Sequence, residues 1–281
     1  MRVASVDGRA VLVAEDVFVD IATASDGAFR AEPMETYARW GELSSWAADA
    51  DLSGGRPLAS AALACPVPAP RQVFALAVNY RDHAIEASIE PPKHPLVFTK
   101  FPSCISGPYA EIPLSSNRAD WEVELVVVMA RETWRVSEAD AWAAVAGLTV
   151  GQDISERRLQ FRKPFPHLSL AKSLPGFGPI GPMVVSPDEM LEPDALRLSC
   201  SVNGEVMQDA TTSDLIFSVP RLIAEISASV RMQPGDLIFT GTPSGTGSTR
   251  DPRRYLQPGD VVESSIEGIG SMTNVCTEAS T

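Results

Sequence analysis

Two carboxylates lie in the most apolar stretch of the sequence, Ala119 to Met129, where Glu122 and Glu124 are separated by one residue and precede a run of valines. The valine content favours a β-strand, and its period of two places both acids on one face. A strand this apolar is expected to be covered on both sides, where a carboxylate without a partner would protonate. The pair therefore requires a divalent metal or a basic side chain, unless both acids lie at a solvated sheet edge.

A third acid, Asp153, ends a predicted strand that begins at Leu148, and it is the next candidate metal ligand. The alternative is an ordinary acid at the start of the following helix. Carboxylates with no Cys or His nearby in the sequence suit a hard ion such as Mg²⁺ or Mn²⁺ rather than zinc. Lys172, which we expect in an apolar strand, is either a buried cation facing the acids or a strand-edge residue.

Of the three histidines, His83 is the candidate general base. It lies in a predicted helix that follows the short strand 73–78, and Glu86 comes three residues later on the same helical face. Glu86 could orient the imidazole ring and raise its basicity, as a general base requires. The alternative is an exposed His/Glu pair on a surface helix. His94 lies among prolines and is expected in a solvent-exposed loop.

Two glycine-rich stretches do not support a nucleotide site. Residues 176–181 match G-x-G-x-x-G, but Pro179 and Pro182 prevent the helix whose N-terminus would hold a pyrophosphate. The loop 241–247 lacks the Lys-Ser/Thr pair of a phosphate-binding loop, and we interpret it as a turn beside a ligand. The sequence also lacks G-x-S-x-G, which argues against a serine hydrolase.

The composition excludes several classes of function. A formal charge of −13 and a pI near 4.7 argue against binding to nucleic acid or to an anionic membrane surface. No apolar run reaches the roughly 18 residues of a membrane helix, and the N-terminus has no apolar segment of signal-peptide length, so we expect a cytoplasmic chain. The four cysteines are far apart and are expected to be reduced, mostly buried thiols.

The predicted elements divide the chain near residue 70. Asp7-Gly8 joins two apolar runs into a predicted hairpin, and a helix is predicted over 34–48. The proline-rich stretch 66–70 is typical of a stiff connector. Residues 1–70 are therefore predicted to form a small N-terminal domain, and residues 71–281 the catalytic domain.

The second region is predicted to be rich in strands. Ser155 is expected to cap a helix that carries Arg157 and Gln160, and Asn203-Gly204 predicts a second hairpin. Gln-Pro-Gly-Asp occurs at 233–236 and again at 257–260, each time before an apolar strand, and Pro followed by Gly suits a type II turn.

A series of motifs, in order from about residue 72 to the end, resembles the fumarylacetoacetate hydrolase family. The motifs are Asn79-Tyr80-Arg81-Asp82-His83, Lys100-Phe101-Pro102-Ser103, Asp120-Trp121-Glu122-Val123-Glu124-Leu125, Gln152-Asp153-Ile154-Ser155, Arg157 to Gln160, Ala171-Lys172-Ser173, Pro179-Ile180-Gly181-Pro182, Val202-Asn203-Gly204-Glu205, Pro234-Gly235-Asp236 and Thr240-Gly241-Thr242-Pro243. Each motif alone is weak, but so many in register make the sequence similar to bacterial acylpyruvase and hydroxymuconate isomerase members of that family.

The resemblance implies an α+β, β-rich fold: a β-roll of mixed sheets with a small N-terminal α/β domain, usually as a homodimer. It implies Mg²⁺ or Mn²⁺ bound by Glu122, Glu124 and Asp153. It also implies a catalytic His83/Glu86 pair on a short helix that orders over the substrate.

The resemblance further identifies Lys172 with the family's active-site lysine. The residues that it implies in substrate binding are Tyr80, Arg157, Gln160 and Thr242. Trp121 and Gln152 depart from the family's usual Tyr and Asn, and Gln152 could shift a hydrogen bond near the metal. The segment 161–167 matches no pattern and is a candidate determinant of substrate choice.

These residues predict a metal-dependent enzyme acting on a small 2-oxo acid. A 2,4-dioxo acid of the acylpyruvate or fumarylpyruvate type would chelate the metal, His83 would activate water, and pyruvate and a carboxylic acid would leave. Without a delivered water the same site could decarboxylate oxaloacetate or isomerise a hydroxymuconate-type dienol. The alternative from another class is a non-catalytic protein that binds a small molecule.

Overall fold

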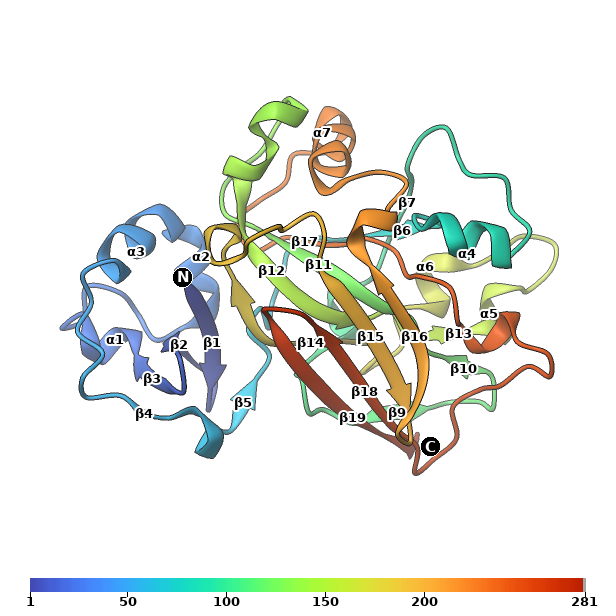
Figure 1. Ribbon diagram of the computed structural model, residues 1–281, viewed down its shortest axis with the longest axis horizontal. Coiled ribbons are helices and arrows are strands. Elements are labelled where there is room, and N and C mark those ends of the chain that lie inside the picture. Colours follow the sequence, from blue (N-terminus) through green and yellow to red (C-terminus); the bar gives the residue numbers. More distant parts are fainter. Residues whose placement is uncertain (280–281) are drawn as a thin grey trace.

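The structure is a computed structural model that describes residues 1–279, and β-strands dominate it (Figure 1). The strands are β1 (Arg2–Val6), β2 (Arg9–Ala14), β3 (Val17–Asp20), β4 (Arg56–Pro57), β5 (Leu63–Ala64), β6 (Val73–Ala77), β7 (Leu96–Thr99), β8 (Ile105–Ser106), β9 (Ile112–Leu114), β10 (Ala119–Asp120), β11 (Val123–Met129), β12 (Val145–Gln152), β13 (Ser155–Glu156), β14 (Gly178–Val185), β15 (Arg197–Val202), β16 (Glu205–Thr211), β17 (Leu237–Phe239), β18 (Val261–Ile266) and β19 (Gly270–Glu278).

The helices are short and lie around the sheets. The α-helices are α1 (Ile21–Ala24), α2 (Pro33–Ala38), α3 (Trp40–Ala47), α4 (Arg81–Glu86), α5 (Arg157–Gln160), α6 (Leu168–Ala171) and α7 (Val219–Ser229), and the 3₁₀ helices are η1 (Leu58–Ser60), η2 (Pro102–Cys104), η3 (Glu138–Ala144), η4 (Pro187–Glu189), η5 (Thr212–Asp214) and η6 (Gly247–Thr249). Figure 1 shows α4, α5 and α6 together at the end of the molecule away from the N-terminus.

One large mixed sheet passes through the molecule in the order β4-β3-β2-β1-β14-β12-β11-β17-β6-β7, with β5 paired to β1 and β8 to β14. A second sheet has the order β16-β15-β18-β19-β9, and β10 pairs with β13. The two large sheets enclose the main core, as expected of a β-roll of mixed sheets. The predicted α+β, β-rich fold class is confirmed.

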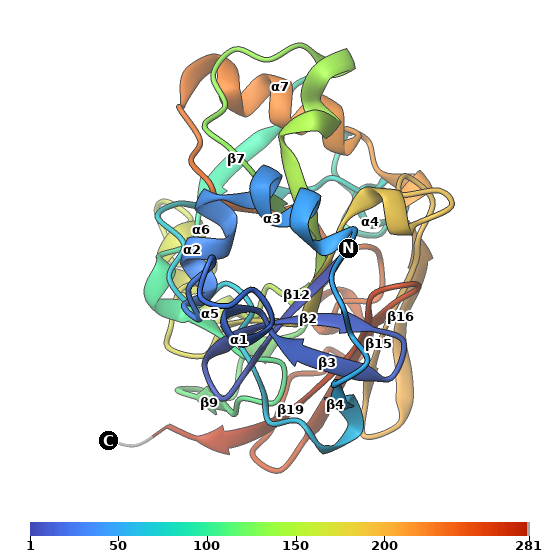
Figure 2. The same ribbon diagram turned by 90° about the vertical axis from the view of Figure 1, so that its left-hand side faces the viewer.

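The N-terminal region continues the large sheet. The predicted β1–β2 hairpin turns at Asp7 and Gly8, whose φ angles of 52° and 76° suit a type I′ turn. β1 pairs with β2 on one side and β14 on the other, so residues before and after position 70 share one sheet. Figure 2, which faces this region, shows α1, α2 and α3 beside these strands.

The helix predicted over 34–48 is broken at Arg39, where φ is −121°. The Arg39 guanidinium donates to the carbonyl of Ala28 and to Glu42, which fixes the break. Tyr37 and Trp40, on either side of it, stack with ring centroids 5.6 Å apart, and both are buried. The break therefore lets both rings enter the core, which a continuous helical period does not predict.

β11 is the centre of the core. Val123, Leu125 and Val127 pack into one buried apolar cluster, while Val126 and Val128 pack into another on the opposite face. β11 also pairs with β12 on one side and β17 on the other. The expectation that this strand is covered on both faces is confirmed, so any polar side chain on it must find its partner inside the protein.

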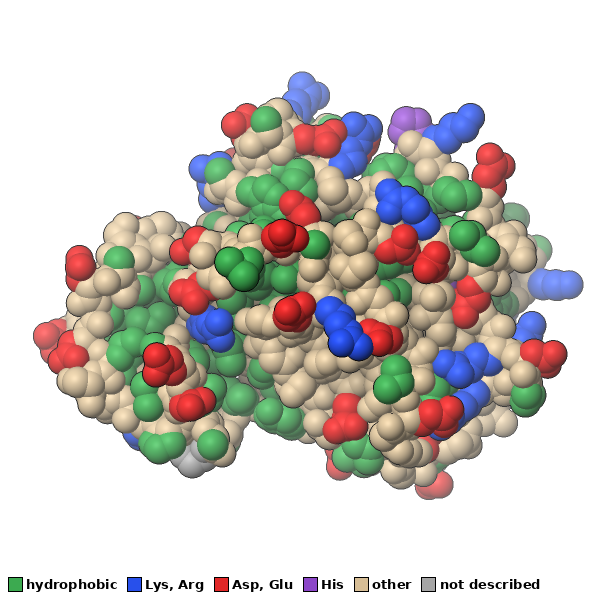
Figure 3. All heavy atoms as spheres, viewed as in Figure 1, with side chains coloured by type: hydrophobic (Ala, Val, Ile, Leu, Met, Phe, Trp, Pro, Cys, Tyr) green, Lys and Arg blue, Asp and Glu red, His purple; other side chains and the backbone are tan. Residues whose placement is uncertain are grey.

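The surface and the thiols agree with the composition. None of the helices described is long and apolar enough to cross a membrane. On the face in Figure 3, acidic and basic side chains are interspersed. All four cysteines are free thiols, and all except the half-buried Cys65 are buried, as predicted.

Candidate active site

The predicted strand from Ala119 to Met129 is interrupted at its start. β10 ends at Asp120 and β11 begins at Val123, so Glu122 lies between two strands. Its backbone N–H donates to Oε1 of Gln152 at 2.8 Å, and its carbonyl accepts the N–H of Asp153 at 2.9 Å. These bonds join the start of β11 to the end of β12. Glu122 therefore lies in the segment between β10 and β11, and not on the face of a regular strand.

Glu122, Glu124 and Asp153 form a buried acidic triad, with one carboxylate oxygen from each residue lying within 4.8 Å of the others. Oε2 of Glu124 accepts the N–H of Gly241 at 2.8 Å, but its Oε1 is buried without a hydrogen-bond partner. Burial, together with the charges of Asp153 and Glu122, raises the pKa of Glu124 well above its ordinary value.

Two basic side chains hold the other oxygens of the triad. Arg157 donates to Oδ2 of Asp120 at 2.8 Å and to Oε1 of Glu122 at 2.6 Å. The Lys172 ammonium lies 2.6 Å from Oε2 of Glu122 and 2.7 Å from Oδ2 of Asp153. Burial opposes ionisation of Glu122, but Lys172 and Arg157 outweigh it and lower its pKa to about 2. The alternative of two acids at a solvated sheet edge is excluded.

Two local predictions around these residues are wrong. Lys172 does not lie in a strand but directly follows α6, whose end aims the ammonium at the triad. Ser155 does not cap α5; the carboxylate of Glu156 does, accepting the N–H groups of Arg158 and Leu159. Ser155 instead accepts a hydrogen bond from Lys172 at 2.7 Å. A longer carboxylate side chain caps the helix, which frees the serine hydroxyl for the site.

Lys100, which the sequence placed in a motif without a role, is a second buried lysine at the triad. Its ammonium lies 2.6 Å from Oδ1 of Asp153 and also donates to the carbonyl oxygens of Lys172 and Phe177. These acceptors use all three of its N–H donors. Lys100 therefore connects Asp153 to both ends of the segment from Lys172 to Phe177. Since the partners lie 53 to 77 residues away, no local pattern points to them.

We expect Lys100→Met to lower the free energy of unfolding by about 3 kcal/mol, because it leaves Asp153 short of one buried partner. Urea unfolding in EDTA measures this change. Lys93→Met is the control, since Lys93 is exposed. Equal stability of Lys100→Met and Lys93→Met would show that the Lys100 ion pair has no structural role.

The candidate base is oriented as predicted. Nδ1 of His83 lies 3.1 Å from Oε2 of Glu86, and Oε1 of Glu86 accepts the N–H of Gly245 at 3.0 Å. Burial opposes ionisation of Glu86, but the hydrogen bonds from His83 and Gly245 leave its pKa below the ordinary value. A carboxylate acceptor at Nδ1 favours the tautomer with the proton on Nδ1, which leaves Nε2 free to accept a proton.

A cavity of about 160 Å³ brings most of the predicted residues together. The predicted site residues that line it are His83, Glu122, Arg157, Gln160, Lys172 and Thr242. Glu86 and Asp153 lie behind this lining and contact it through His83 and Lys172, and Glu124 lies with Glu122 and Asp153 in the triad. Tyr80 is fully buried outside the lining, and its hydroxyl has no hydrogen-bond partner. The cavity is smaller than the roughly 300 Å³ of typical drug-sized sites, so it suits a small substrate.

The loop 241–247 lies beside this cavity and closes around Asp120. The N–H groups of Gly247 and Ser248 donate to the two oxygens of Asp120 at 2.7 and 2.9 Å. A Cβ atom at Gly247 would lie 2.0 Å from the carbonyl oxygen of Arg254, so only glycine fits there. Asp120 thereby fixes both this loop and Arg157. Its position one residue before Trp121 carries no sequence signal for this role.

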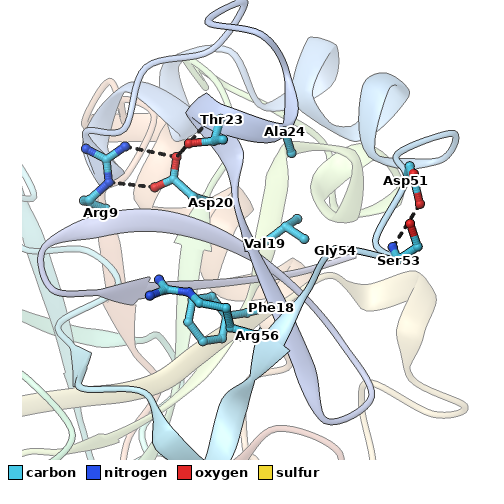
Figure 4. A pocket seen from close by; sticks show the side chains of 10 residues that line it. All are labelled: Arg9, Phe18, Val19, Asp20, Thr23, Ala24, Asp51, Ser53, Gly54 and Arg56. Atoms are coloured by element: carbon cyan, nitrogen blue, oxygen red, sulfur yellow. Dashed lines mark hydrogen bonds and ion pairs between the residues drawn. The ribbon is translucent and has the colours of Figure 1, made fainter.

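A wider cavity of about 670 Å³ lies in the N-terminal region (Figure 4). There Arg9 pairs with Asp20 at 2.7 Å, and the Arg56 guanidinium lies 4.7 Å from the centre of the Phe18 ring. None of the predicted site residues lines it. We assign the chemistry to the smaller cavity, because that cavity adjoins the buried ionised groups.

The triad fits a divalent cation. It offers only carboxylate oxygens, which suit Mg²⁺ and Mn²⁺. Oε1 of Glu124 is a buried acceptor without a donor, and such an atom is costly unless something absent from the protein chain completes it. Burial and the two neighbouring acids raise the pKa of Glu124, and a cation held by the triad would favour the ionised carboxylate again.

The fold and the site together define a class of protein, a β-roll enzyme with a buried acidic triad at the start of a central strand. Residues 72–277 match the family model described as Fumarylacetoacetate (FAA) hydrolase C-terminal. The chain belongs to the fumarylacetoacetate hydrolase family.

Its relatives have different activities. Human mitochondrial oxaloacetate tautomerase FAHD2A is 40% identical over 220 residues, which cover 78% of this chain and 70% of that protein. The crystal structure of a candidate HpcE protein from Mycobacterium smegmatis is 47% identical, with a TM-score of 0.95 and full coverage of both chains. Maleylpyruvate hydrolase from Sphingobium sp. SYK-6, solved with Mn²⁺ and pyruvate, is 27% identical, with a TM-score of 0.80 and full coverage of both chains.

Proposed function

We propose that this chain is a divalent-metal-dependent hydrolase that cleaves the C3–C4 bond of a small 2,4-dioxo acid, giving pyruvate and a carboxylic acid. One observation carries the proposal: His83, oriented by Glu86, and the Lys172 ammonium line one small cavity that adjoins the acidic triad. A base and a cation at one cavity are the two groups that a hydrolysis through an enolate requires.

The triad of Glu122, Glu124 and Asp153 would hold Mg²⁺ or Mn²⁺. When bound, the cation supplies positive charge for the carboxylate and 2-oxo oxygens of the substrate. The bound Mn²⁺ and pyruvate of the maleylpyruvate hydrolase support this choice of cofactor and of substrate class.

The protein's own groups perform the proton transfers. Nε2 of His83 takes a proton from water as the water oxygen bonds to C4 of the substrate. The C3–C4 bond then breaks, and its electron pair leaves as the enolate of pyruvate. Lys172 stabilises that negative charge, because its ammonium is buried beside the triad and needs no reorganisation. A proton returned to C3 completes pyruvate, so one water is consumed and one net proton is released.

Substrate contacts follow from the remaining lining. Arg157 donates to Oε1 of Gln160 at 2.7 Å, which leaves the Gln160 amide N–H groups for a substrate oxygen. Thr242 donates its hydroxyl to the carbonyl of Val123 and accepts from Gln208, so its orientation is fixed. We propose Gln160 and Thr242 as substrate-binding residues, with Arg157 positioning both Glu122 and Gln160. We also propose that Tyr80 supports substrate binding from behind the cavity lining. We propose a homodimer as the assembly.

Product and proton stoichiometry test the proposed reaction. With acetylpyruvate and Mn²⁺, hydrolysis should release acetate and pyruvate in equal amounts and one proton per pyruvate, measured enzymatically and with a pH indicator. Disappearance of acetylpyruvate without acetate, or pyruvate release without a proton, would contradict hydrolysis.

The second candidate is keto–enol tautomerisation of oxaloacetate, favoured by the 40% identity to the FAHD2A tautomerase. The same Nε2 of His83 would then move a proton at C3, with no attacking water. The decay of enol-oxaloacetate absorbance, faster with the protein than without it, would identify this activity. A rate above that of acetylpyruvate cleavage would place tautomerisation first.

A further inference from the structure

Part of the lining of the active-site cavity is apolar. Its larger side chains come from four separate segments: Leu76 in β6, Ile89 after α4, Phe161 after α5 and Leu168 at the start of α6. Phe161 is 63% exposed and Ile89 is 47% exposed, although both are large apolar groups. Exposed apolar side chains at a cavity mouth are typical of a surface that a ligand covers.

The cations of the same cavity are already engaged. Arg157 donates to Asp120, Glu122 and Gln160, and Lys172 donates to Glu122, Asp153 and Ser155. His83 is paired with Glu86. Among the described lining residues, no lysine or arginine is left to pair with a second carboxylate on the far end of a substrate.

We infer that the substrate is a 2-oxo acid whose only charge is its C1 carboxylate, and that its other end is an uncharged acyl group packed against Phe161, Ile89 and Leu168. Phe161 is then a specificity-determining residue. The inference rests on the proposed function, since it places the C1 end of the substrate at the triad. It also gives a physical role to Phe161, the first residue of the segment 161–167.

A pair of ligands with equal carbon number tests this without turnover. 2-Oxohexanoate and 2-oxoadipate differ in that the second carries a carboxylate at its far end. Calorimetric titration of the Mn²⁺-loaded protein should give at least tenfold tighter binding of 2-oxohexanoate. Equal binding, or tighter binding of 2-oxoadipate, would overturn the inference even if acetylpyruvate is hydrolysed.

Phe161→Arg should reverse this preference, because it replaces an apolar wall with a free cation. The matched control is Phe165→Arg, which makes the same change in the same segment at a side chain that is 73% exposed and does not line the cavity. An equal shift in both variants would show a general effect of surface charge and overturn the role of Phe161.

Turnover separates this inference from the proposed function. Acylpyruvates with an uncharged acyl group should be cleaved with a kcat/KM at least tenfold above that of fumarylpyruvate. Phe161→Arg should reduce this difference in kcat/KM. A lack of cleavage of all acylpyruvates, together with the expected binding preference, would refute only the hydrolase. Cleavage with fumarylpyruvate preferred would refute only the inferred substrate class.

Discussion

Glu124→Gln is expected to lower metal-dependent turnover about 1,000-fold, a loss of several kcal/mol of transition-state stabilisation. The amide has nearly the same shape but removes one of three carboxylates from the triad. Glu124 is also the triad member without a basic partner, since its Oε1 is unpaired and its Oε2 accepts only a backbone N–H. The cation is therefore its expected partner. The rate of acetylpyruvate turnover measures the loss of activity, and titration with Mn²⁺ measures the loss of metal affinity.

Stability separates a lost ligand from a lost fold. In EDTA, Glu124→Gln should melt no lower than the unchanged protein, because the amide relieves a carboxyl whose pKa burial and two neighbouring acids raise. Mn²⁺ should then raise the melting temperature of the unchanged protein but not of the variant, since only binding to the folded state stabilises it. Glu267→Gln, at an exposed acid, is the control. Full metal-dependent activity in Glu124→Gln would refute the triad as the metal site.

His83→Ala is expected to lower acetylpyruvate hydrolysis by about 10²–10⁴-fold, the usual contribution of a general base. Residual decarboxylation of oxaloacetate should fall much less, because that reaction needs no attacking water. Parallel assays of pyruvate release from both substrates measure the difference.

The metal site should be intact in His83→Ala, so its Mn²⁺ affinity should equal that of the unchanged protein. His94→Ala, in an exposed loop, should leave both activities unchanged. Equal losses of hydrolysis and decarboxylation in His83→Ala would contradict the assigned role in activating water.

The sequence predicts the carboxylates of the active site because they occur where acidic residues are unfavourable. Two carboxylates in an apolar strand are costly unless a cation accompanies them, and such conflicts mark functional positions. Glu122, Glu124 and Asp153 do lie together. The hairpin at Asp7-Gly8 is likewise predictable, because its turn depends only on the residues that form it.

Other features depend on contacts that no local pattern contains. Lys100 directly follows the edge strand β7, yet its ammonium reaches Asp153 and the carbonyls of Lys172 and Phe177. Glu156 caps α5, while Ser155 accepts a hydrogen bond from Lys172, a partner 17 residues away that the local helix-cap pattern does not contain. These are tertiary demands, and they override the local preference of each residue.

The gap in the central strand has a similar origin. Trp121 is fully buried, and its indole N–H donates to the carbonyl of Gly245 at 3.1 Å. The backbone N–H of Val123 donates to the side chain of Gln208 rather than to a strand. These long-range bonds replace sheet pairing around Glu122. The strand period of two therefore predicts that Glu122 and Glu124 lie close together, but it does not predict the strand break that places Glu122 in the site.

The most direct test of the metal-dependent hydrolase is pyruvate release from acetylpyruvate by one preparation in three successive states: with Mn²⁺, after removal of the ion with EDTA, and after Mn²⁺ is restored. We predict rapid release with an equal amount of acetate in the first state, loss of release in the second, and recovery in the third. Release that EDTA does not change, or no release from a preparation that binds Mn²⁺, would contradict it.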